Sequence, residues 1–304
     1  MLIPENIPTI LNKGFGTWTR NLSICVPFIL NAVVNGFLIL LSMFMMVAIL
    51  TTSSMSGMSI DPTSMSPEQM MGMLSSSFFD HIWIIAILSL LTFFLITVIQ
   101  AYFTAGAIGM ARTASEKGTT VLNDMFRSAR ENVFNLLLVK ILISLIVLAG
   151  VIFIVPGILA VGDIQTLISN PGDSIANTIL LAFGLLVWTL YAIIASIAFT
   201  FVEYSLVVDR LDPISAIENG FRCLMDNKLD VIVMWLVLIS ISVITSVIGE
   251  MMSSIKFFES FWTFADLFIS FAVIQPLTAV WWTRMYLDRT GKELYNIDDL
   301  LNYP

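Results

Sequence analysis

The chain has 304 residues, of which 58% are hydrophobic and only 12% are charged, and its formal net charge at pH 7 is -8. Soluble domains carry roughly 25% charged residues, so this composition excludes an ordinary soluble protein. A helix that crosses the hydrocarbon core needs about 20 mostly apolar residues. Six segments meet that length, at 25–50, 82–108, 134–160, 176–203, 231–249 and 264–284. The sequence therefore predicts an all-α integral membrane protein, with residues 1–304 as a single transmembrane domain of six helices.

An amphipathic stretch precedes the first predicted span. In Leu11–Asn21 (LNKGFGTWTRN), apolar residues recur at i, i+4 and i+7 and so form one stripe along a helix. A stripe of this kind beside polar residues predicts a short helix that lies in the membrane interface. The stretch returns in looser form as Leu122–Asn132 (LNDMFRSAREN) and Ile217–Asn227 (IENGFRCLMDN), each time ahead of an odd-numbered span.

Each of the three copies places Asn six residues after Phe. The aromatic residues are Phe15, Phe126 and Phe221, and the amides are Asn21, Asn132 and Asn227. We expect each Phe ring to lie at the headgroup boundary or against the adjacent hairpin, and each Asn to cap the free N–H groups where the next span starts. The copies predict three parallel repeats, each an interfacial helix followed by a transmembrane hairpin, at about 6–108, 119–203 and 212–286.

Amide side chains lie inside three of the predicted spans. Asn31 and Asn35 are one helical turn apart in the first span, while Gln100 lies in the second and Gln275 in the sixth. Such amides either form hydrogen bonds between helices or line a permeation path, and both interpretations stay open. The connection between the first two spans, at 51–81, is an outer loop rich in Met and Ser.

His81, at the end of this loop, is the only histidine of the chain. A metal hydrolase or phosphodiesterase would normally need several converging His and carboxylate ligands. The sequence also has no Gly-rich phosphate loop, no CxxC pair and no HExxH motif. We therefore expect no metal, no cofactor and no enzymatic activity.

Two charged residues lie inside the predicted spans. Lys140 in the third span and Glu203 near the end of the fourth have similar depths. They either form an ion pair or Lys140 extends to the headgroups, and the sequence does not decide between the two.

Later residues predict where the long helices change direction and where they end. Pro156 and Pro276 should kink or break the helices that contain them. Trp281 and Trp282 are predicted to belong to an aromatic belt at the inner membrane surface. Residues 287–304 are predicted to form a cytoplasmic tail. Ahead of the third amphipathic stretch, Asp212 and Pro213 predict a helix start.

Basic residues predict the orientation. Of the 14 lysines and arginines, 12 lie before the first span, between spans two and three, between spans four and five, or after the sixth. By the positive-inside rule, both termini should be cytoplasmic, in a multi-pass protein of a prokaryotic cell membrane. The expected partner is the lipid bilayer and not nucleic acid; a homo-oligomer or an unidentified membrane or cytoplasmic partner stays open.

The stretch Phe201–Asn227 (FVEYSLVVDRLDPISAIENGFRCLMDN) and the six-span plan resemble a large group of prokaryotic membrane proteins. That group is related to the membrane domain attached to some glycerophosphoryl diester phosphodiesterases and is largely uncharacterised. The resemblance implies the membrane fold alone, since this chain lacks the soluble phosphodiesterase barrel and its catalytic residues.

Together these patterns favour a non-enzymatic membrane protein, either a transporter or channel for a small solute or ion, or a lipid-interacting accessory protein. One alternative is a membrane-embedded enzyme, which would need Glu203, Asp266 or His81 to converge on one cavity. Another is a scaffold whose interfacial helices dock a cytoplasmic partner.

Overall fold

The computed structural model describes residues 4–55, 78, 80–161, 175–254 and 256–295, and the regular structure within these ranges is helical throughout. In this part of the chain, six helices are long and apolar enough to cross a membrane. They are Leu22–Thr51, Ile82–Lys117, Leu122–Ala160, Ala176–Asp209, Lys228–Met252 and Phe261–Arg289. The prediction of an all-α chain with six such helices is confirmed. Most of the loop 51–81 and the end of the tail lie outside the described residues.

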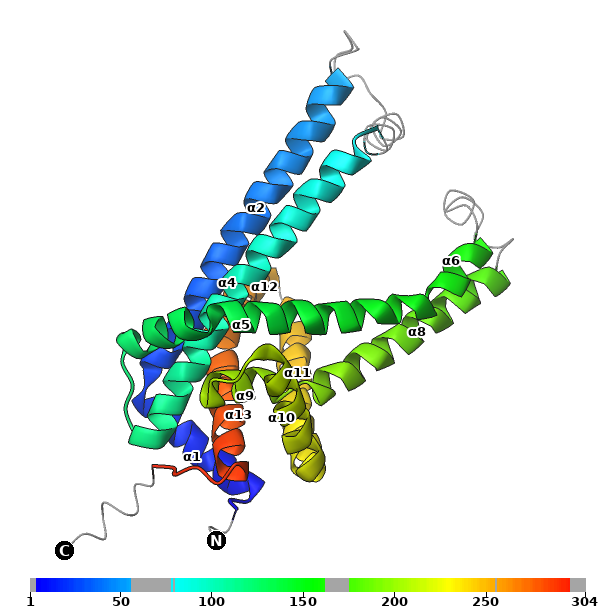
Figure 1. Ribbon diagram of the computed structural model, residues 1–304. Coiled ribbons are helices and arrows are strands. Elements are labelled where there is room, and N and C mark those ends of the chain that lie inside the picture. Colours follow the sequence, from blue (N-terminus) through cyan, green and yellow to red (C-terminus); the bar gives the residue numbers. More distant parts are fainter. Residues whose placement is uncertain (1–3, 56–77, 79, 162–174, 255, 296–304) are drawn as a thin grey trace, which may run out of the picture.

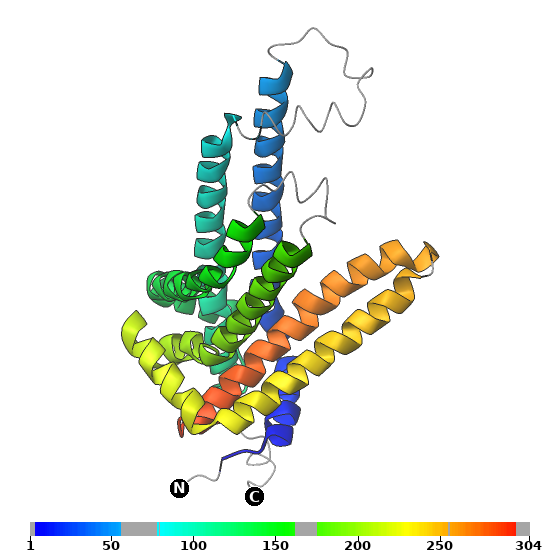
Figure 2. The ribbon, with the colours of Figure 1, turned by 90° about the vertical axis from the view of Figure 1, so that its right-hand side faces the viewer.

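The six long helices form three hairpins. The first pairs α2 (Val26–Met55) with α4 (Ile82–Lys117). The second pairs α5 (Leu122–Ala149), the 3-10 turn η3 (Gly150–Phe153) and α6 (Val155–Val161) with α8 (Ile175–Ala198). The third pairs α11 (Lys228–Ser253) with α12 (Lys256–Ile269), the π-helical segment η4 (Ser270–Ile274) and α13 (Gln275–Arg289). Figures 1 and 2 show the hairpins diverging from one end of the molecule.

We call the end at which the hairpins converge the base. Three short helices and one 3-10 turn pack there: α1 (Ile7–Arg20), η1 (Leu22–Cys25), α9 (Val202–Asp209) and α10 (Pro213–Asp226). In the most apolar window of each span, only 6–11% of the residues are buried, except for 28% in the last span. The hydrophobic core therefore lies in the base, and the spans keep most of their apolar surface exposed.

The centre of the base is aromatic. Phe201 is fully buried, and its ring centroid lies 5.6 Å from that of Trp282 and 5.7 Å from that of Tyr286. Trp281 and Trp282 are only 7% and 4% exposed. The prediction that these two residues belong to an aromatic belt is therefore wrong, because their rings pack inside the protein. The indole N–H of Trp281 donates to the carbonyl of Leu11 and ties α13 to α1.

An ion pair joins the two ends of the chain within the base. Arg284 is 1% exposed and donates two hydrogen bonds of 2.8 Å to the carboxylate of Glu5. Lys13 also donates to this carboxylate. Burial raises the pKa of Glu5, but the hydrogen bonds from Arg284 and Lys13 outweigh it, so that the pKa is lowered from 4.5. Glu5 is therefore ionised when it balances the buried guanidinium.

The short helices α1 and α10 each start with a side-chain cap. The side chain of Asn6 accepts a hydrogen bond from the N–H of Thr9 at the start of α1. Asp212 does the same for Ser215 at the start of α10, which confirms the predicted helix start at Asp212 and Pro213. Hydrogen bonding from the Ser215 side chain, and next from its N–H, lowers the pKa of Asp212.

The second amphipathic stretch is not a separate helix. Leu122–Asn132 forms the first part of α5, which continues to Ala149. No Gly or Pro occurs in this whole range, so no residue in it interrupts the helix. The prediction of an interfacial helix is wrong for this copy, whereas the first and third copies form α1 and α10.

The three repeated asparagines also differ from expectation. The amide nitrogen of each donates to the carbonyl four residues earlier, in Thr17, Ser128 and Cys223 respectively. Asn21 and Asn227 make no side-chain cap to the helix that follows, and Asn132 lies within α5. The predicted capping of the next span is therefore wrong, because each amide satisfies the preceding helical turn instead. Asn21 additionally bonds the backbone of Gly118 and Thr120, which closes the turn between α4 and α5.

Candidate functional site

A groove of about 460 Å³ with several polar side chains runs between the two arms of the third hairpin. One side is formed by Leu238, Ser242, Thr245, Ser246 and Gly249 of α11, and the other by Trp262, Asp266, Ser270, Ile274 and Thr278. The lining thus contains five hydroxyl groups and one carboxylate between helices that are otherwise apolar. None of the described residues that line the groove is basic. The carboxylate of Asp266 gives the groove a negative charge when it is ionised.

Helical spacing brings these side chains to one face of each arm. On the second arm, the lining residues from Trp262 to Thr278 follow one another in steps of four. Each step of four residues turns an ideal α-helix by about 40° beyond a full turn, so a long series would drift off the face. The π-helical segment η4 takes an extra residue into its turn, which reduces this drift and keeps Asp266 and Thr278 on the same groove.

Pro276 and Cys25 both bear on the carbonyl of Ala272, which lies in the π-helical segment. Pro276 has no N–H, so it cannot bond the carbonyl of Ala272, four residues earlier. The thiol of Cys25, at the end of η1, donates to this carbonyl. The helix does not break at Pro276 but changes from α to π geometry just before it, and Cys25 supplies a hydrogen-bond donor that the sequence did not reveal.

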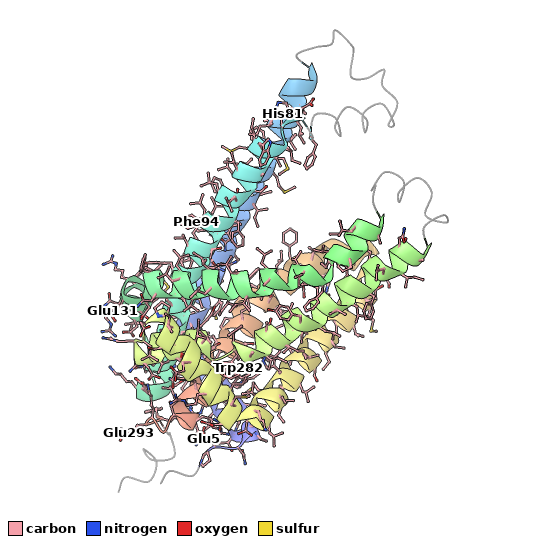
Figure 3. All side chains as sticks on the ribbon, turned by 45° about the vertical axis from the view of Figure 1, so that its right-hand side comes forward. Glu5, His81, Phe94, Glu131, Trp282 and Glu293 are labelled. Atoms are coloured by element: carbon pink, nitrogen blue, oxygen red, sulfur yellow. The ribbon has the colours of Figure 1, made fainter. Side chains whose placement is uncertain are left out.

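Aromatic side chains follow the groove toward the base. Trp282 lies one step of four beyond Thr278, and Trp235 lies three residues before Leu238 on the other arm. The two indole centroids are 6.4 Å apart, and the N–H of Trp235 donates to the hydroxyl of Thr200. Figure 3 shows Trp282 in the base, where the hairpins meet. A pair of packed aromatic rings thus lies on the base side of the groove.

The two charged residues that the sequence placed at one depth do meet. The Lys140 ammonium lies 2.5 Å from a carboxylate oxygen of Glu203, and both side chains are partly buried. The pair joins α5 to the start of α9. Of the two interpretations of Lys140, the structure therefore contains the ion pair.

The predicted intramembrane amides do not form one site. Asn35 donates to Asn31 within α2, and the Asn35 carbonyl oxygen is buried without a hydrogen-bond partner. Gln100 is exposed on α4, and Gln275 donates weakly to Ser270 at 3.4 Å. Only Gln275 therefore contacts a residue of the groove.

The three repeated phenylalanines have similar surroundings. Phe15 is 49% exposed, and Phe126 and Phe221 are each 43% exposed. Each of these residues is thus a little under half exposed at the surface of the base, and its location in a headgroup layer stays a prediction.

The residue before each of these phenylalanines faces inward and makes a close helix contact. A Cβ atom added to Gly14 would meet Trp281, and one added to Gly220 would meet the backbone of Val202. At the corresponding position of the second copy, Met125 packs so closely that a Cβ on Gly106 would meet it. In all three copies, the contact is with the helical segment that leads out of a membrane-spanning hairpin into the base.

The groups required for an embedded enzyme do not converge. Glu203 pairs with Lys140 at the base, and Asp266 lies in the third hairpin. Figure 3 shows His81 at the far tip of the first hairpin. Among the described residues, no group of three or more His, Cys, Asp or Glu side chains could hold a metal ion.

Sequence reasoning missed most of the groove. The sequence pointed to Asp266 only as a candidate for an embedded enzyme, and it gave no separate signal for the hydroxyl residues of α11. The signal that could have found them is the recurrence of small polar residues at helical spacing in two consecutive apolar spans, since a purely lipid-facing helix has no need of them.

These features define a multi-pass helical membrane protein with a polar groove in one hairpin. The chain belongs to the family described as domain of unknown function (DUF7847), whose model matches residues 11–284. An uncharacterised protein of Archaeoglobus fulgidus is 25% identical over 294 residues, which covers 92% of this chain and 95% of the relative. No solved structure matches the chain. Neither match points to the membrane domain of glycerophosphoryl diester phosphodiesterases, and the comparisons support only the expectation that the family is uncharacterised.

Proposed function

We propose that this protein is a non-enzymatic membrane transporter or channel that takes a small cationic solute into the groove of the third hairpin. The single observation that carries the proposal is the groove itself, in which one carboxylate and five hydroxyl groups lie between apolar helices. Burying an ionisable group in a membrane is costly, so an intramembrane carboxylate is a strong functional candidate. Hydroxyl and carboxylate oxygens are ligands of hard cations, and the absence of a basic residue among the described lining favours positive charge.

The aromatic residues at the end of the groove fit alternating access. Trp235 and Trp282 pack together on the base side of the groove, and in this proposal a solute bound near Asp266 reaches the far side when these rings move. The π-helical segment next to Pro276 is a natural point for such a rearrangement, because π segments are frequent at functional sites and Pro weakens the local hydrogen bonding.

We propose further that the chain is built from three parallel units that surround the base, with both termini on the cytoplasmic side of a cell membrane. The corresponding close contacts at Gly14, Met125 and Gly220 support the three units, because each copy packs at the same position against the exit of another hairpin. The distribution of basic residues supports the orientation. The groove would then open toward the outer face.

The test is a flux measurement on the purified full chain in liposomes. Uptake of Na⁺, K⁺ and protons is followed with dyes trapped inside the liposomes. The native chain is compared with the variants Asp266→Gln, Asp266→Asn and Glu218→Gln at equal protein density. Glu218 is 69% exposed on α10 and paired with Arg222, so its substitution is a charge-matched control outside the groove. We expect flux of at least one cation in the native chain and in Glu218→Gln, with loss in both Asp266 variants. Flux that is absent in the native chain, or unchanged without the Asp266 carboxylate, contradicts the proposal.

A further inference from the structure

A second hollow, of about 150 Å³, lies in the base where α4, α5 and α9 meet. It is separate from the groove and shares none of its lining residues. Its basic lining residues are Arg112, Lys117, Arg127 and Arg210, and its acidic ones are Glu116, Asp124 and Glu131. Four basic and three acidic side chains leave a net charge of +1 by count. Figure 3 shows Glu131, one of the lining residues, at the surface of the base, and its side chain is 41% exposed.

The arginines of this pocket lie on α4, on α5 and at the C-cap of α9, and they retain free hydrogen-bonding capacity. Arg112 is held by Glu116 and by the carbonyl of Val208, each at 2.8 Å. Arg127 and Arg210 each have one ion-pair contact of 3.0 Å, and their side chains are 56% and 65% exposed. A guanidinium group carries five N–H donors in a planar fork, so one such contact leaves several donors available.

The other polar groups of the pocket are used within the protein. The hydroxyl of Ser128 donates to the carbonyl of Ala105, and the amide of Asn132 donates to the carbonyl of Ser128. The hydroxyl of Thr113 donates to the carbonyl of Gly109. A ligand in this pocket would therefore be recognised by the ammonium of Lys117 and by the guanidinium groups, which match the oxygen geometry of phosphate.

We propose that this pocket binds a phosphate group, either that of an anionic lipid headgroup or free phosphate. The pocket lies at the base ends of membrane-spanning helices, which is where headgroups are found, and basic pockets between such helices bind anionic headgroups. A phosphate held by Arg112, Arg127 and Arg210 would link α4, α5 and α9. Binding should therefore stabilise the base as well as fix the protein to the bilayer surface.

The experiment measures the melting temperature of the full chain in a neutral detergent. A short-chain phosphatidylglycerol, a short-chain phosphatidylcholine and inorganic phosphate are titrated separately at constant ionic strength. The test variant is Arg127→Gln with Arg210→Gln. The control is Arg20→Gln with Arg222→Gln, which removes the same charge from exposed positions on α1 and α10.

We expect phosphatidylglycerol or inorganic phosphate to raise the melting temperature of the native chain and of the control. In the test variant, the apparent affinity should fall by about fivefold for each arginine removed. A rise with the anionic lipid alone identifies a headgroup site, and a rise with inorganic phosphate as well identifies a site for phosphate in general; both outcomes support the pocket.

Two results would overturn this inference. One is the absence of any rise in the native chain with either phosphate-containing anion, and the other is an equal loss of affinity in the test variant and the control. If the double variant does not fold, Arg127→Lys and Arg210→Lys keep the charge but lose the planar fork, and weaker binding is expected from each. Because the site is separate from the groove, cation flux and phosphate binding can fail independently.

Discussion

Replacing Gly220 with Ala tests the packing of α10 on α9 with a single methyl group. The Cβ of this Ala would lie 2.8 Å from both the Cα and the N of Val202, and 3.0 Å from the carbonyl carbon of Phe201. All three atoms belong to the backbone, so no side-chain rotation can relieve the contact. The two helices must move apart, and Phe201, which is fully buried at the centre of the base, must move with α9.

The magnitude follows from two opposing effects. Overpacking of a dense core costs typically about 1–3 kcal/mol, while Ala within a helix stabilises by about 0.5–1 kcal/mol relative to Gly. We expect net destabilisation by about 1–2 kcal/mol for Gly220→Ala. Gly106→Ala should cost less, because its nearest atom belongs to the flexible side chain of Met125. Gly36→Ala has no atom within 4 Å of the new Cβ and should be neutral or stabilising.

The assay is thermal unfolding of the three variants in the same detergent, followed by the loss of the monodisperse peak in size-exclusion chromatography. The account predicts that Gly220→Ala has the lowest melting temperature, that Gly106→Ala is intermediate, and that Gly36→Ala matches or exceeds the native chain. If Gly220→Ala is as stable as Gly36→Ala, the close contact of α10 with α9 does not exist in the folded protein, and the support for three similar units is lost.

Three further predictions concern polar contacts. Cys25→Ala should cost about 1 kcal/mol because a helix carbonyl loses its donor, while Cys25→Ser keeps a donor and should cost less; thermal unfolding of the pair decides. Glu5→Gln should destabilise by about 3 kcal/mol at pH 7, because it leaves Arg284 buried without its counter-charge. The folded-state pKa of Glu5 is lowered from 4.5, so the ionised carboxylate should contribute fully to the free energy of unfolding above pH 4.5. This contribution should disappear as the pH falls through the folded-state pKa. The melting temperatures of the native chain and of Glu5→Gln should therefore converge in acid. For Lys140 and Glu203, a double-mutant cycle with Lys140→Gln and Glu203→Gln should give a coupling free energy of about 1 kcal/mol, and additive losses would show that the pair is not formed.

The helices could largely be predicted from the sequence because their signals are local. Length and apolarity identified six spans, and Asp212 with Pro213 marked the start of α10. The prediction of a separate helix at the second amphipathic stretch was wrong. Its apolar stripe matched those of the other two stretches, but it contains no residue that could end a helix. An apolar stripe records which face is buried, but Gly, Pro and caps decide where a helix stops.

The site depends on long-range packing, and there the sequence was less informative. Because Lys140 and Glu203 have similar depths in two predicted spans, the sequence offered their ion pair as one of two interpretations. The burial of Trp281 and Trp282 could not be predicted, because the helices α1 and α9 that cover them are distant in sequence. The groove could not be predicted, because its prediction requires knowing that the small polar residues of the two arms of the third hairpin face each other.

The most direct test of the proposed function is chemical labelling of the groove. Ser246→Cys places a thiol on the groove lining, and Ser240→Cys places one on the exposed opposite side of α11 as a matched control. The two native cysteines are buried, and burial raises the pKa of Cys223 to about 12, so the native chain should react little. In liposomes, we predict that a positively charged methanethiosulfonate labels Ser246→Cys faster than a negatively charged one, that Asp266→Asn removes this preference, and that Ser240→Cys reacts with neither. Equal rates with both reagents, or no reaction at Ser246→Cys, would show that the groove is not a water-accessible path that attracts cations.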